Sequence, residues 1–176
     1  LRRRMIEGPD FVWMHFPKSG GTALQAFLRA RFSELPDVIC DPIDPQNQIW
    51  HDSLTKRAER DETFNPSPKR IMCGIRRLPY WVLSHVHFAA GRKDERDPKV
   101  TRDMLVKGIT SVEPCGPVTA DMMLRSFQPH RVDRWVKNES MAGDLQTAFE
   151  GLRYAGKVKA DAIPRVNETI IYRPIK

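Results

Sequence analysis

Residues 17–22, Pro-Lys-Ser-Gly-Gly-Thr, combine the residue types that bind a phosphate or sulfate group. The pair Gly20-Gly21 lets the backbone approach an anion closely, and the N–H groups of a following helix would point toward it. Lys18 adds a positive charge, and the hydroxyls of Ser19 and Thr22 add hydrogen-bond donors. The plain alternative is a tight turn with a surface lysine. The order of these residue types, between a strand and a helix, favours an anion site.

Two elements must position this loop. The apolar run Phe11–Phe16 predicts a buried strand before it. Residues 22–25, Thr-Ala-Leu-Gln, fit a capping box and predict that a helix starts at Thr22. Apolar residues continue at helical spacing through Leu24, Phe27, Leu28 and Phe32. The loop is not a Walker A motif, because its lysine precedes the glycines instead of following them.

Residues 11–22 resemble the 5′-phosphosulfate loop of sulfotransferases, the enzymes that use 3′-phosphoadenosine-5′-phosphosulfate (PAPS). In that family a strand leads into a Pro-Lys-Ser/Thr-Gly-x-Thr-type loop, often with a histidine two residues before the proline. His15 and Pro17 reproduce this pattern. The resemblance implies that the cofactor is bound by Pro17, Lys18, Ser19, Gly20, Gly21 and Thr22. Lys18 would also be catalytic, by stabilising charge on the bridging oxygen as the S–O bond breaks.

A second segment is similar to the family's 3′-phosphate motif, in which an arginine after a strand is followed by a proline and, eight positions beyond the arginine, a serine. Residues 70–75 predict such a strand, and Ser84 lies eight positions after Arg76. The resemblance implies that Arg76 and Ser84 bind the 3′-phosphate. Leu78 occupies the family's proline position and Pro79 follows one place late, which leaves open whether Arg76 or Arg77 makes the contact.

A third stretch, residues 135–145, is similar to the family's strand and Glu-Asn-Leu-x-x-Asp-Leu-like helix, with the order of Glu and Asn changed. The resemblance covers about residues 11–152. It implies transfer of a sulfuryl group from PAPS to the hydroxyl or amine of a small-molecule or carbohydrate acceptor. Adenosine 3′,5′-bisphosphate would be the other product. Because such transfer depends mainly on positioning and electrostatics, no metal is expected.

The transfer also needs a group that takes the acceptor's proton. His51 lies between the two phosphate motifs, the interval in which the family commonly carries its base. An unperturbed imidazole is mostly neutral at pH 7 and suited to this role. Glu34 and Glu59 are carboxylate alternatives, and His15 would only pack against or orient the loop. The plain alternative for His51 is a surface histidine beside Asp52.

The rest of the chain alternates between strand-like and helix-like segments, which predicts an α/β fold. We expect a single domain, residues 1–176, with a mostly parallel central sheet flanked by helices and a P-loop-like sulfotransferase fold. Further strands are expected near residues 38–40 and 133–137. Helices are expected near residues 53–61, 78–90, 102–107, 118–127 and 139–152, with an exposed loop at 91–99.

Composition limits the possible partners and location. The 29 Lys and Arg residues exceed the 22 Asp and Glu residues by 7, which suits an anionic ligand. Aromatic residues are not interleaved with the basic ones, so nucleic acid is disfavoured as a partner.

The location follows from apolar runs and cysteines. Apolar runs are shorter than the roughly 18 residues of a membrane span. Three cysteines without a C-x-x-C pair favour a reducing, cytoplasmic location, although a trimmed N-terminal signal would leave no trace here; the oligomeric state is open.

Two other functions share the physics of a strand, a loop and a helix. One is a P-loop-type kinase or nucleotide phosphotransferase, which the position of Lys18 disfavours. The other is a non-catalytic module that binds a nucleotide or a polyanion. Magnesium separates the phosphotransferase from the sulfotransferase. The phosphotransferase would depend on magnesium with ATP, whereas the sulfotransferase would bind adenosine 3′,5′-bisphosphate without a metal.

Overall fold

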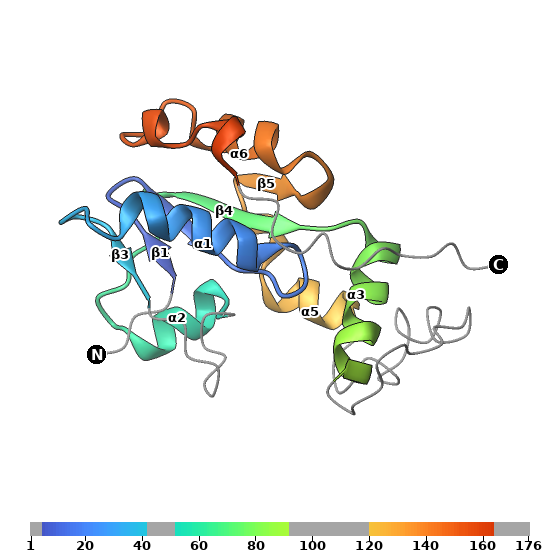
Figure 1. Ribbon diagram of the computed structural model, residues 1–176. Coiled ribbons are helices and arrows are strands. Elements are labelled where there is room, and N and C mark those ends of the chain that lie inside the picture. Colours follow the sequence, from blue (N-terminus) through green and yellow to red (C-terminus); the bar gives the residue numbers. More distant parts are fainter. Residues whose placement is uncertain (1–4, 42–51, 92–119, 164–176) are drawn as a thin grey trace.

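The computed structural model describes residues 5–41, 52–91 and 120–163, and Figure 1 shows their arrangement. The strands are β1 (Ile6–Glu7), β2 (Phe11–Met14), β3 (Ile39–Cys40), β4 (Arg70–Ile75) and β5 (Arg134–Lys137). The helices are α1 (Gly21–Phe32), α2 (Leu54–Arg60), α3 (Leu78–Gly91), α5 (Ala120–Ser126) and α6 (Met141–Phe149). Short 3-10 turns are η2 (Pro129–Arg131), η3 (Asn138–Ser140), η4 (Ala155–Lys157) and η5 (Ala160–Ala162).

The five strands form one sheet in the order β3-β1-β2-β4-β5. Strands β2, β4 and β5 run parallel, whereas β1 pairs antiparallel with both β2 and β3. The expectation of a mostly parallel sheet is therefore wrong, and the sheet is mixed. The cause is a tight return of the chain before β2, where the N–H of Gly8 donates to the carbonyl of Phe11 at 2.9 Å.

Helices cover both faces of the sheet, which confirms the α/β class. Alternate residues of β2 enter two separate cores: Phe11 and Trp13 pack with α1 and α6, while Val12 and Met14 pack with α2, α3 and α5. All four residues of β2 are buried, as expected for a strand covered on both sides. The loop after β2 consequently starts from a buried part of the sheet.

The helix after the loop begins differently from the prediction. Helix α1 starts at Gly21, and its N-cap residue is Gly20, which has a left-handed backbone (φ 78°) and gives no side-chain cap. The predicted capping box at Thr22 is therefore wrong. Helix α2 matches its prediction, with Ser53 Oγ accepting from the Lys56 N–H at 3.4 Å. The predicted helix at 102–107 and most of the predicted loop at 91–99 lie outside the described residues.

None of the helices within the described ranges has both the length and the apolar character that crossing a membrane requires.

Candidate functional site

Three chain segments meet at one edge of the sheet, where the parallel strands end. Met14 of β2 lies opposite Cys73 of β4, and Ile75 of β4 lies opposite Lys137 of β5. The segments that follow are the loop at residues 15–20, the pair Arg76-Arg77, and η3. Ligand sites in open α/β sheets occur beyond the carboxyl ends of the strands. The predicted phosphate loop and the predicted 3′-phosphate arginines thus share the expected edge.

The backbone of the loop contains two left-handed residues. Lys18 (φ 62°) and Gly20 (φ 78°) both have positive φ and flank Ser19. Left-handed residues in a turn occur in anion-binding concavities, where successive backbone N–H groups face one side. The N–H groups of Ala23 and Leu24 bond to the Gly20 carbonyl, at 3.1 and 3.4 Å. The first N–H groups of a helix have no carbonyl in a preceding turn to bond to. Such groups at a helix start therefore suit an anion.

The hydroxyl of Ser19 faces into the protein. Ser19 is fully buried, and its Oγ donates to the Phe16 carbonyl at 2.6 Å. This bond fixes the turn and occupies the hydroxyl proton. Ser19 would therefore contact a bound anion through its backbone N–H, while its side chain stabilises the loop.

Two glycines allow the loop to pack against its neighbours. A Cβ on Gly74 in β4 would lie 3.0 Å from Ser19 Oγ. A Cβ on Gly20 would lie 2.2 Å from Asn138 Oδ1 and 2.9 Å from Met141 Cε. The loop is therefore held between β4 beneath it and the segment that links β5 to α6.

The segment expected to bind the 3′-phosphate lies against the loop. Arg76 follows β4 and is half-buried, whereas Ser84 on α3 is buried. Trp81, between them in the chain, donates from Nε1 to the Pro17 carbonyl at 2.8 Å. Pro79 is the second residue of α3, and a proline in the first helical turn costs no hydrogen bond. The displaced proline is therefore compatible with a regular helix start.

Arg77 and Glu139 connect the second and third segments. The N–H of Arg77, which is exposed, donates to Glu139 Oε1 at 3.1 Å. The positive end of the helix dipole at the start of α3 also stabilises this carboxylate. Sequence reasoning missed Glu139 and Asn138 as site residues, although the similarity of residues 135–145 to the family's third stretch contained the signal.

The predicted bases are distributed differently. His51 lies outside the described residues. Glu34 follows the end of α1, whose 12 residues span about 18 Å, so it lies at the far end of that helix from the loop. Glu59 is exposed on α2, which is tied to the end of β3 by an Arg57–Asp41 ion pair of 3.1 Å. His15 is buried directly after β2, in agreement with a packing role.

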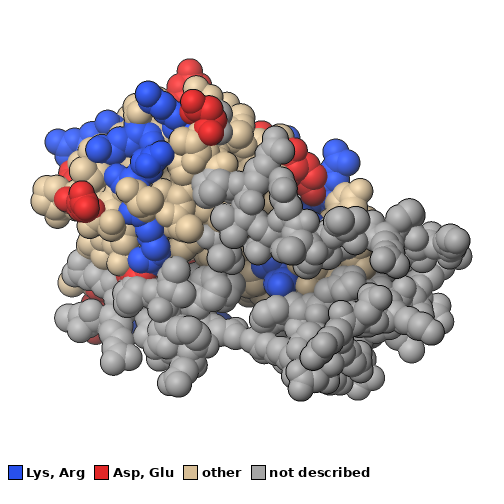
Figure 2. Space-filling model, in the orientation of Figure 1, with Lys and Arg blue, Asp and Glu red and all other residues tan. Residues whose placement is uncertain are grey.

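The charged side chains visible in the space-filling view are of mixed sign. Lys and Arg gather at the upper left, and Asp and Glu stand among them (Figure 2). Ion pairs among the described residues include the exposed Arg153 and Asp37, 2.8 Å apart. The described part of this face is thus a solvated mixture of charges and not a uniform basic surface.

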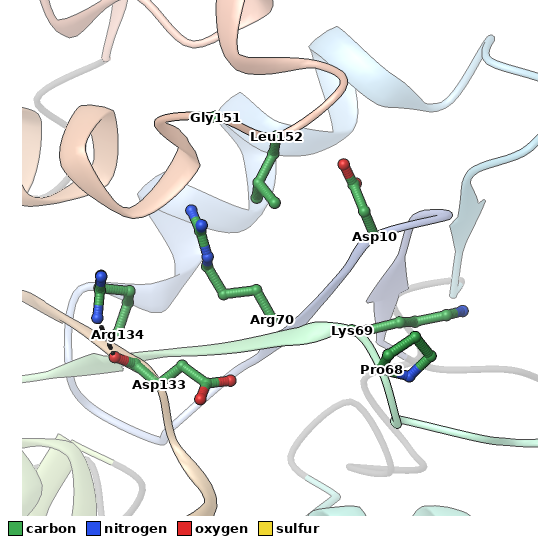
Figure 3. A pocket seen from close by; sticks show the side chains of 8 residues that line it. All are labelled: Asp10, Pro68, Lys69, Arg70, Asp133, Arg134, Gly151 and Leu152. Atoms are coloured by element: carbon green, nitrogen blue, oxygen red, sulfur yellow. Dashed lines mark hydrogen bonds between the residues drawn. The ribbon is translucent and has the colours of Figure 1, made fainter.

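A hollow of about 480 Å³ lies at the opposite edge of the sheet, where β4 and β5 begin (Figure 3). Its charged side chains already serve the fold. Arg70 Nη1 donates to the carbonyls of Ala148 and Glu150, at 2.9 and 2.7 Å, and Asp133 Oδ2 accepts from the Ile71 N–H at 2.7 Å. The Arg70 bonds join the sheet to the end of α6, and the Asp133 bond joins β4 to the residue before β5. The loop edge, with two left-handed residues before a helix start, is the better candidate site.

Comparison with known proteins identifies no relative: no family model, no curated protein and no solved structure matches this chain. The candidate site therefore rests on the loop at residues 15–20 and on the contacts that the two neighbouring segments make with it.

Proposed function

We propose that this chain is a PAPS-dependent sulfotransferase with a P-loop-like fold. The observation that carries the proposal is the loop between β2 and α1, in which Lys18 and Gly20 have positive φ and which Trp81 joins to the segment carrying Arg76 and Ser84. One segment would bind the 5′-phosphosulfate and the other the 3′-phosphate. This pairing favours a nucleotide with anionic groups at both positions.

PAPS supplies an activated sulfuryl group. The backbone N–H groups of the loop and the ammonium of Lys18 bind the phosphosulfate, and Lys18 stabilises the negative charge that develops on the bridging oxygen. Bond formation between the acceptor's oxygen or nitrogen and sulfur accompanies cleavage of the sulfur–oxygen bond to the 5′-phosphate. His51 takes the acceptor's proton in this proposal, and adenosine 3′,5′-bisphosphate leaves. The acceptor is a small molecule or a carbohydrate.

Glu139 has a different role in the proposal. Its carboxylate already accepts the Arg77 N–H at the start of α3. It therefore holds the arginine segment in place beside η3. A positioning role of this kind leaves proton transfer to His51.

Calorimetry with the full chain tests the proposal. Adenosine 3′,5′-bisphosphate should bind without magnesium, and about tenfold or more tightly than adenosine 5′-phosphate, because a charge-assisted contact contributes about 1.5–3 kcal/mol. Arg76→Ala should reduce this preference. Arg134→Ala, which changes an arginine at the opposite edge of the sheet, should preserve it.

Two results would contradict the proposal. Equal affinity for the two nucleotides would remove the 3′-phosphate segment from the site. Tight binding of ATP only in the presence of magnesium would favour a phosphotransferase. If Arg76→Ala keeps the preference for the bisphosphate, the 3′-phosphate contact is assigned to Arg77 instead. The same assay on Arg77→Ala tests that assignment.

A further inference from the structure

Trp81 connects the two segments of the candidate site. It lies on α3, five residues after Arg76 and three before Ser84, and its side chain is 2% exposed. Its indole Nε1 donates to the Pro17 carbonyl at 2.8 Å. The residue that contacts the loop thus lies between the two residues expected to bind the 3′-phosphate, Arg76 just before α3 and Ser84 on it.

The bond to Pro17 sets the direction of the next backbone donor. A trans peptide group is planar, and its C=O and N–H point to opposite sides. Holding the Pro17 carbonyl toward α3 therefore turns the N–H of Lys18 away from α3. Pro17 has no N–H of its own, so this peptide presents the first backbone donor of the Pro-Lys-Ser-Gly-Gly-Thr loop.

The indole is itself held in one orientation. Its ring stacks on the His85 ring, with centroids 5.1 Å apart and planes 20° apart. The Phe16 ring, next to Pro17 in the chain, lies 6.1 Å away on centroids. Both neighbours restrict rotation of the side chain, so the donor reaches the carbonyl from a fixed direction.

We propose that Trp81 is a positioning residue for the phosphosulfate loop: through the Pro17 carbonyl it orients the Lys18 peptide, and with it the first backbone donor to the 5′-phosphosulfate. This inference depends on the proposed function. It differs from a purely structural role, because it predicts an effect that depends on which phosphate the ligand carries.

The test compares three probes by calorimetry: adenosine 5′-phosphate, adenosine 3′-phosphate and adenosine 3′,5′-bisphosphate. In Trp81→Phe, the two probes with a 5′-phosphate should bind about fivefold more weakly, since a neutral hydrogen bond contributes about 1 kcal/mol. Adenosine 3′-phosphate should stay within about twofold of the wild type. Trp135→Phe is the matched control, because Trp135 packs against the same apolar cluster from β5.

A second variant removes only the donor. Benzothienylalanine at position 81 keeps the shape of the indole and replaces its N–H by sulfur, so it should reproduce the selective loss even where Trp81→Phe does not fold. An equal loss for all three probes, or no loss for any, would overturn the inference. Absence of bisphosphate binding in the wild-type chain would instead overturn the proposed function, and that result appears before any variant is measured.

Discussion

Lys18 combines a charge with an unfavourable backbone conformation. Its φ of 62° is uncommon for a residue with a Cβ. Such a conformation costs about 1–3 kcal/mol and persists where the surroundings impose it. Here the Ser19 hydroxyl fixes the Phe16 carbonyl and Trp81 fixes the Pro17 carbonyl. The fold thus accepts local strain at the residue whose charge the proposed reaction needs.

Two substitutions at Lys18 separate its charge from its strain. Lys18→Ala keeps the Cβ and removes the ammonium, so it should weaken binding of adenosine 3′,5′-bisphosphate about tenfold or more at unchanged stability. Lys18→Gly should weaken binding similarly and raise the free energy of unfolding by about 1 kcal/mol, because glycine adopts positive φ without a steric penalty. Calorimetry and urea unfolding measure the two effects. Wild-type affinity in folded Lys18→Ala would contradict the assignment of Lys18.

At the scale of elements, the spacing of apolar residues predicted most of the strands and helices, because both faces of the sheet are buried. The continuous apolar run of β2 and the apolar stripe along α1 follow from the two cores, one on each face of the sheet. Strand β1 escaped prediction since its two residues, Ile6 and Glu7, carry no periodic pattern. That strand makes the sheet mixed.

The sequence pattern named the residue types of the candidate site, but it did not predict which residues contact one another. The order of Pro17, Lys18 and Gly20 pointed to the loop, and the capping box at Thr22 was wrong because Gly20 adopts the left-handed cap instead. The approach of Asn138 to Gly20 joins segments far apart in the chain. Local patterns hold no information about such a contact, which depends on the order of strands in the sheet.

Gly20→Ala tests how closely the loop is packed. The added methyl would combine a positive φ with an overlap against Asn138 and Met141, so the free energy of unfolding should fall by about 2 kcal/mol or more. Gly143→Ala on α6 is the control, because its Cβ would meet no atom within 4 Å. It should gain about 0.5–1 kcal/mol from helix propensity. Urea unfolding of both variants decides; a neutral Gly20→Ala would show that the loop is loosely held.

At the scale of the whole molecule, the net charge of +7 does not reveal which charges lie inside. Asp41, at the end of β3, and Arg57, on α2, are 0% and 2% exposed and form an ion pair of 3.1 Å. Asp61 Oδ2 lies 3.9 Å from Arg57 Nη2. A buried pair of this kind carries a large desolvation cost. It ties α2 to the β3 side of the sheet, and no spacing in the sequence predicted it.

Asp41 should make stability depend on pH. Burial raises its pKa from 3.8 to about 7, against the opposing effect of the Arg57 and Arg29 charges, with Glu7 acting in the same direction as burial. Between these two values the folded chain keeps a proton that the unfolded chain releases. The contribution of Asp41 to the free energy of unfolding is therefore complete below about pH 4 and is lost as the pH rises through about 7. Urea unfolding at several pH values from 4 to 8 measures this trend.

Asp41→Asn is the control, because an asparagine cannot titrate. The loss of unfolding free energy between pH 4 and 8 that comes from Asp41 should be absent in this variant, so the stability difference between wild type and variant should change with pH. A difference that is constant with pH would show that Asp41 is ionised throughout, held charged by Arg57.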